Sequence, residues 1–208
     1  MKEEQDYIRD IAEIRSMMER SSKFMSLSGL AGILAGMYAL AGAWIAYRFL
    51  DFNPDKIVYS SVESGGIASG LSGVIVLAIA ILIMAIGTAI FLSYRKADKR
   101  DEKAWNAISR RMIANMTVPL VAGGILIVIL LSNGFLGLIA PLTLLFYGLA
   151  LYTASKFTYD DVKFLGLIQI GLGLTGAWFI EYGLLLWAIG FGVVHIVYGI
   201  YMHLKYER

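Results

Sequence analysis

The sequence predicts an all-α integral membrane protein with six transmembrane helices. Composition is the first observation, because 58% of the 208 residues are hydrophobic, only 16% are charged, and the mean hydropathy is +0.69. A soluble domain has about 25% charged residues. The second observation is that the charged residues leave five long uncharged stretches, of 24, 31, 44, 17 and 23 residues. The third is an unequal distribution of lysine and arginine across the connecting segments.

The six expected spans follow from the lengths of these stretches. A spanning helix needs about 20 apolar residues to cross about 30 Å of hydrocarbon. The 44-residue stretch is therefore expected to fold back on itself at Ser132, Asn133 and Gly134, its only run of turn-forming residues. The expected spans are 24–47, 70–94, 112–131, 135–155, 164–180 and 184–204.

Counting basic residues predicts the orientation. With the N-terminus in the cytoplasm, 16 of the 18 lysines and arginines lie on the cytoplasmic side, which matches the positive-inside rule. Both termini are therefore expected inside, with a cytoplasmic arm at 1–23 and a tail at 205–208. The polar start of the chain does not resemble a cleaved signal peptide. We expect a multi-pass protein of a bacterial cytoplasmic membrane.

The N-terminal arm has the spacing of an amphipathic helix. Tyr7, Ile11, Ile14 and Met18 are separated by 4, 3 and 4 residues, which places them on one helical face. The other faces carry basic and acidic residues in nearly equal number, whereas a membrane-surface helix is rich in lysine and arginine. The pattern favours packing against the bundle or against a second copy of the chain.

The segment 95–111 is strongly basic and forms a second candidate contact surface. One interpretation is a surface that binds lipid headgroups or a protein partner, and the other is a segment that only fixes the topology. Its basic residues are Arg95, Lys96, Lys99, Arg100, Lys103, Arg110 and Arg111.

Small residues follow one face of three expected spans. Helices in lipid associate where small side chains let their backbones approach, so these glycines predict packing faces. The stripe of the first span would also suit a homodimer. The glycines are Gly29, Gly32 and Gly36 in the first span, Gly166, Gly173 and Gly176 in the fifth, and Gly192 and Gly199 in the sixth.

Two polar residues, Gln169 and His195, fall on these packing faces and form a candidate intramembrane site with Thr175. Polar residues inside a membrane are costly and therefore indicate a functional site. The alternatives are a path-lining pair, with a histidine that exchanges protons, or a neutral histidine hydrogen-bonded between helices. Four carboxylates on the outer side could form a cation-collecting mouth or could be solvated loop ends: Asp51, Asp55, Glu63 and Glu181.

Several chemistries are not expected. The absence of cysteine excludes disulfides and thiolate ligands, and the net charge of +2 argues against a nucleic-acid partner. His195 and His203 are eight residues apart on one expected helix and cannot jointly ligate one metal ion. The sequence contains none of the HExxH, GxSxG or phosphate-loop motifs. We expect no catalytic residue, no metal and no cofactor.

The junction from arm to first span reads EIRSMMERSSKFMSLSGLAGILAGMYALAGAW over residues 13–44. This segment resembles a family of polytopic inner-membrane proteins from Bacteroidota to which no activity is attached. The resemblance implies a bacterial cytoplasmic membrane and assigns no site residue.

These observations favour a non-enzymatic accessory or regulatory membrane protein that acts through protein or lipid contacts at its cytoplasmic face. One alternative is a small transporter or channel with a path lined by Gln169 and His195. Another is an intramembrane binder of an apolar ligand such as a quinone or lipid.

Overall fold

The computed structural model describes residues 11, 23–25, 27–50, 52, 67–99 and 103–207, and this part of the chain is helical and contains no strand. The prediction of an all-α fold is confirmed. The main helices are α2 (Gly29–Phe49), α4 (Ile67–Asp98), α5 (Ala107–Ser132), α6 (Ile139–Ala154), α7 (Asp161–Trp178), α8 (Gly183–Trp187) and α9 (His195–Tyr206). Single 3-10 turns at Leu136–Leu138, Ser155–Phe157 and Ile180–Tyr182 adjoin them, and a π-helix, Ala188–Val194, joins α8 to α9.

Within the described residues, five helical segments are long and apolar enough to cross a membrane. They are 29–49, 71–98, 107–132, 136–157 and 180–206, the last one running continuously through α8, the π-helix and α9. The chain thus has the helices of a multi-pass membrane protein. The fifth expected span, 164–180, corresponds to α7, which is not among the five: it has 18 residues and includes Asp161, Lys163 and Gln169.

Some helix ends differ from the predicted boundaries. The first helix begins at Gly29, five residues later than predicted, and residues 24, 25, 27 and 28 are not helical. The third begins at Ala107, five residues early, because the Asn106 side chain accepts hydrogen bonds from the Ile108 and Ser109 amides as an N-cap. Of the expected amphipathic arm only Ile11 is described, as helical and exposed, and Tyr7, Ile14 and Met18 lie outside the described residues.

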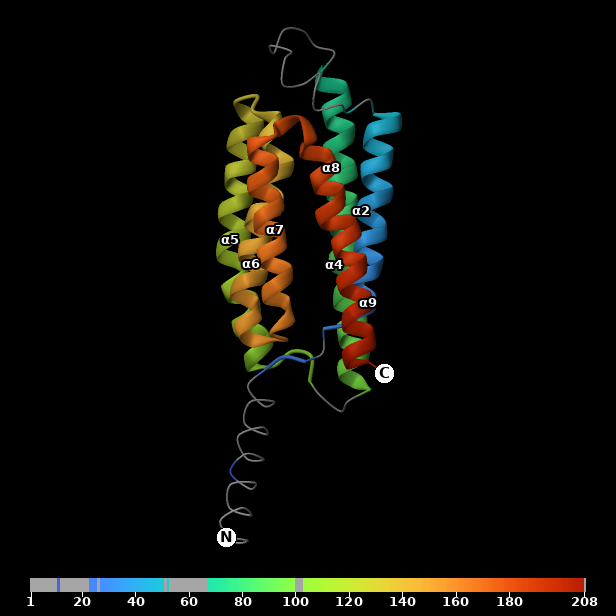
Figure 1. Ribbon diagram of the computed structural model, residues 1–208, viewed down its shortest axis with the longest axis vertical. Helices are drawn as coiled ribbons and strands as arrows, with labels where there is room; N and C mark the ends of the chain where they lie inside the picture. The colour runs from blue at the N-terminus through green and yellow to red at the C-terminus, as the bar shows by residue number, and fades with distance from the viewer. Residues whose placement is uncertain are drawn as a thin grey trace.

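The helices form two groups that the final helical rod joins (Figure 1). In one group α6 packs against both α5 and α7, and in the other α2 packs against both α4 and α9. We call the end of the bundle where α9 ends the basal end and the opposite end the distal end. The outer helices α4 and α5 turn broad apolar faces outward, as helices in contact with lipid do.

Glycines allow two close helix contacts. At the α2–α9 contact, a Cβ added to Gly199 would lie 2.6 Å from the Gly29 carbonyl oxygen, and one added to Gly36 would lie 2.7 Å from the Gly192 oxygen. At the α6–α7 contact, a Cβ on Gly166 would lie 2.8 Å from the Gly148 oxygen. Only glycine permits such approaches.

The remaining glycines of the three stripes lie on the same contacts. Gly32 faces the Gly199 backbone, Gly173 faces the α6 backbone at Pro141 and Leu145, and Gly176 faces the Pro141 ring. The stripe of α2 therefore packs against α9 of its own chain.

Replacing Gly199 by alanine is expected to destabilise the protein by about 1–3 kcal/mol, because the new methyl group would overlap the backbone of α2. The matched control is Gly171→Ala, since a Cβ at Gly171 meets nothing within 4 Å. Thermal unfolding in detergent should show a lower Tm for Gly199→Ala and a Tm at or above the parent value for the control. Equal Tm values for the two variants would contradict a tight α2–α9 contact.

Candidate functional site

The polar site predicted inside the membrane is built around one backbone carbonyl. The Gly190 oxygen accepts a hydrogen bond of 2.8 Å from Gln169 Nε2 and lies 2.8 Å from His195 Nδ1. Gly190 belongs to the π-helix, whose hydrogen bonds join residues five apart rather than four. The altered register turns this carbonyl towards side chains of α7 and α9. The site therefore joins the two helix groups near the middle of the bundle.

The contacts define the tautomer of His195. A carbonyl oxygen can only accept, so Nδ1 of His195 carries a proton and donates to Gly190. The other ring nitrogen, Nε2, lies 3.1 Å from the Tyr147 hydroxyl, which donates to it in the neutral imidazole. Gln169 Nε2 is 3.3 Å from His195 Nδ1, and both nitrogens point their protons at the same carbonyl. Gln169 and His195 thus meet through Gly190.

The site is deeply buried. Gln169 is 0% exposed and His195 is 5% exposed. A Cβ added to Gly190 would lie 2.6 Å from Gln169 Oε1 and 2.5 Å from a methyl group of Leu144, so both side chains would have to shift to admit a larger residue. The Oε1 atom of Gln169 is buried and has no hydrogen-bond partner among the described residues.

Thr175 does not belong to this site. Its side chain is exposed and donates a hydrogen bond of 2.9 Å to the Gly171 carbonyl of its own helix. Six residues separate Thr175 from Gln169, which is about 240° around a helix, so the two side chains lie on different faces. Sequence reasoning also did not single out Tyr147 or Gly190.

Aromatic rings surround His195. Trp187, Phe191 and His195 follow one another at four-residue spacing, and the Phe191 and His195 rings stack with centroids 5.7 Å apart. Tyr147 lies 5.1 Å from the Phe191 ring centroid. The four-residue spacing of Trp187, Phe191 and His195 places them on one helix face, and this pattern in the sequence could have predicted the cluster.

Glu207 joins three helices at the basal end. Its Oε1 accepts two hydrogen bonds, one of 2.8 Å from the Gly29 amide at the start of α2 and one of 2.9 Å from Lys96 Nζ of α4. Its Oε2 contacts Nδ1 of His203 in α9. The Ser28 side chain does not cap α2, so Glu207 satisfies the helix N-terminus instead. Burial raises the pKa of Glu207, but the hydrogen bonds from His203, Lys96 and Gly29 outweigh it and lower the pKa to about 2.

Asp161 joins α7 to α9 at the same end. Its Oδ2 accepts hydrogen bonds of 2.8 Å from Lys205 and 2.7 Å from the Tyr206 hydroxyl, and its Oδ1 accepts 3.2 Å from the Tyr201 hydroxyl. Burial raises the pKa of Asp161, and these three hydrogen bonds together with the charge of Lys205 bring it below its usual value.

The segment before α2 docks beside these carboxylates. The Phe24 amide donates to the Phe157 carbonyl at 2.7 Å, and the buried Thr158 hydroxyl donates to the Phe24 carbonyl at 2.7 Å. Lys23 forms a 2.7 Å ion pair with Asp160. Lys23 and Phe24 are therefore held against the α6–α7 connection.

The basic segment divides into paired and unpaired residues. The Lys96 side chain is 12% exposed and pairs with Glu207, so it is not available as an outer contact. Arg100 lies outside the described residues. Five basic side chains are exposed and form no ion pair within the described chain: Arg95, Lys99, Lys103, Arg110 and Arg111.

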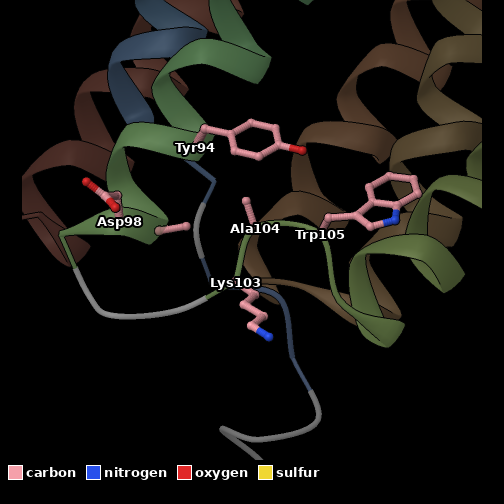
Figure 2. Close-up of a pocket in the computed structure, with 6 residues that line it drawn as sticks. Tyr94, Asp98, Lys103, Ala104 and Trp105 are labelled. Carbon is pink, nitrogen blue, oxygen red and sulfur yellow. The ribbon is translucent and has the colours of Figure 1, made fainter.

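A recess of about 340 Å³ lies among these residues, between the end of α4 and the start of α5 (Figure 2). Tyr94 and Ala97 of α4 line it on one side, and Lys103 and Trp105 line it on the other. Figure 2 shows the Tyr94 ring directed towards the side of the recess where Trp105 lies, while the Lys103 ammonium points outward.

The expected outer mouth is only partly described. Glu181 is exposed at the distal end, in the turn between α7 and α8. Asp51, Asp55 and Glu63 lie outside the described residues. Within the described residues, no three His, Cys, Asp or Glu side chains come together to hold a metal ion.

Comparison with known proteins adds no further guide to function: no family model, no curated protein and no solved structure matches this chain.

Replacing Glu207 by glutamine is expected to lower the Tm at neutral pH, because the buried Lys96 and the α2 N-terminus lose their anion. The folded-state pKa of Glu207 is about 2, below the usual 4.5. Its stabilising contribution is therefore complete above about pH 4.5 and is lost as the pH falls towards about 2. The Tm difference between parent and variant should shrink across this window.

Thermal unfolding in detergent at a series of pH values measures this difference, and Glu181→Gln, at an exposed position, is the control that should follow the parent. A difference between parent and Glu207→Gln that is constant with pH would contradict the assigned ion pair.

Proposed function

We propose that the protein is a non-enzymatic accessory component of a bacterial cytoplasmic membrane that binds the anionic leaflet surface at its cytoplasmic face. The observation that carries this proposal is the division of the basic residues. Lys23, Lys96 and Lys205 each pair with a carboxylate of the chain, whereas the five exposed basic residues of the segment 95–111 have no such partner among the described residues. Charges that do not stabilise the fold are available for an external anion.

The proposed topology has six spans with both termini in the cytoplasm, so that the basal end is the cytoplasmic end. In this topology α7, the fifth helix in chain order to cross the membrane, is added to the five segments that are long and apolar enough. Asp161 and Lys163 lie in the first turn of α7, at the basal end, and Asp161 is neutralised there by Lys205. The remainder of α7 carries no charged residue, and Gln169 is hydrogen-bonded within the bundle.

The recess supports phospholipid headgroups as the contact. Tyr94 and Trp105 are 53% and 59% exposed, and tyrosine and tryptophan favour the interface between hydrocarbon and water. The recess lies where the apolar outer faces of α4 and α5 end and the unpaired basic residues begin. A lipid whose tail lies along these helices would therefore place its phosphate near Lys103.

The basic residues Lys99 and Lys103 should give the protein its preference for anionic lipid. Each basic residue near an anionic surface contributes about 1 kcal/mol, so the double variant Lys99→Gln/Lys103→Gln should lose about 2 kcal/mol and reduce that preference by about thirtyfold. The measurement is native mass spectrometry of lipid retention from mixed phosphatidylglycerol and phosphatidylethanolamine, with the protein reconstituted in nanodiscs.

The matched control is Lys156→Gln/Lys163→Gln, which removes the same charge from two exposed positions, one after α6 and one in the first turn of α7. It should retain anionic lipid like the parent. Unchanged retention by the first pair, or equal losses by both pairs, would contradict a site on the segment 95–111.

A further inference from the structure

Polar side chains are concentrated on one interface of the bundle, between α9 and the pair α6 and α7. We call the set Gln169, His195, Tyr147, Tyr198 and Asp161 the polar interface. It extends from the middle of the bundle to the basal end, where Asp161 meets Tyr201, Lys205 and Tyr206. Polar groups at such depth are costly in a membrane and indicate function when their hydrogen bonds are incomplete.

Tyr198 connects the two ends of this interface. It packs with Tyr147 and Tyr206 around one buried cluster that contains Val162 and Met202. Its hydroxyl is nevertheless buried without a hydrogen-bond partner among the described residues, as is Oε1 of Gln169. Two such atoms on one interface point to a small polar ligand bound between the helices.

The distal half of the same interface is apolar. At Gly190 the neighbours include methyl groups of Leu144 and Leu172, and at Gly176 they are the Pro141 ring and Leu186. Gly183 also faces Pro141. The polar interface therefore ends at Gln169 on its distal side, and between His195 and the basal end Tyr147 and Tyr198 pack on the buried cluster that contains Val162 and Met202.

The hydrogen-bond partners of His195 are compatible with both the neutral and the protonated ring. In the imidazolium form Nδ1 still donates to the Gly190 carbonyl, and Nε2 donates to the Tyr147 oxygen at the same heavy-atom distance. The Tyr147 hydroxyl then turns its proton away from the ring and needs a new acceptor. The unpartnered Tyr198 hydroxyl is the group on this interface that would hold such an acceptor, a bound water.

The groups around His195 are few. Tyr147 faces it from α6, Gln169 from α7 and Tyr198 from its own helix, while α2 presents the backbone of Gly32. The nearest charges of the polar interface belong to the Asp161–Lys205 pair at its basal end. Among the described residues, no carboxylate pairs with His195.

We propose that the polar interface binds water and carries protons between the basal face and His195, with no continuation to the distal face. A proton that arrives through this water binds Nε2 of His195, and the hydrogen bond with Tyr147 reverses. The site is then a proton-binding site open to one side, which suits sensing of pH on that side rather than proton conduction. This proposal does not depend on lipid binding at the segment 95–111.

Solid-state NMR of ring-labelled histidine in nanodiscs tests the site directly. The variant His203→Gln leaves His195 as the only histidine. We expect the neutral Nδ1–H tautomer at high pH, exchange of that proton in D₂O, and conversion to the imidazolium at low pH. A ring that stays neutral and unexchanged down to the lowest pH at which the protein remains folded would overturn the proposal.

A second variant tests the role of Tyr198. Tyr198→Phe removes one water-binding hydroxyl and should slow exchange of the His195 proton by about tenfold, the ratio expected for one lost hydrogen bond. Tyr182→Phe, at an exposed distal position, is the control and should exchange like the parent. An exchange rate unaffected by Tyr198→Phe would overturn the assigned water site.

Sidedness is tested in sealed vesicles with a buffered interior, sorted by capture through a C-terminal tag. Acidifying the outer medium should protonate His195 only where the C-terminus faces outward. Protonation in both orientations would indicate a continuous path, and protonation only with the C-terminus inside would reverse the assigned direction. Either result would overturn the proposal.

Discussion

The two groups of helices are joined at the Gly190 carbonyl, and the packing around it depends on that single acceptor. Gln169 of α7 and His195 of α9 both donate to it, so neither side chain can turn away without leaving a buried donor unpaired. The π-helix makes the carbonyl available, and the missing side chain of Gly190 makes room for Gln169. Breaking either bond would leave a polar group unpaired inside the bundle, so the register of the final helical rod against α7 is fixed at this point.

Charged residues serve two different purposes at the basal end. Asp161 and Glu207 collect donors from several helices and hold α2, α4, α7 and α9 together. These carboxylates are largely screened from water, and each has more than one hydrogen-bond donor. The unpaired basic residues around Lys103 lie outside this network. The bundle can therefore lose an external charge without losing its internal links, which separates stability from surface binding.

The sequence allowed much of the helical architecture to be predicted, because uncharged length and glycine spacing depend on local physics alone. It also predicted that Gln169 and His195 would lie close together, since a short connection makes their helices neighbours. Thr175 was wrongly included because it shares a helix with Gln169 but not a face. Tyr147 and Gly190 could not be found in this way, because periodicity shows a helix face but not the opposing helix, and a π-helix has no spacing signal. The partners of Lys96 could not be predicted either, because they lie in distant parts of the chain.

The position of Glu207 has a consequence for the order of assembly. The amide of Gly29, at the start of α2, donates its hydrogen bond to a residue 178 positions later in the chain. During synthesis α2 enters the membrane with that amide uncapped, and Lys96 of α4 likewise waits for its partner. The first helices of the chain can reach their final arrangement only after α9 has been made. Completion of the bundle is thus a step that follows translation of every span, and a chain interrupted before this residue would remain a loosely held intermediate open to proteolysis.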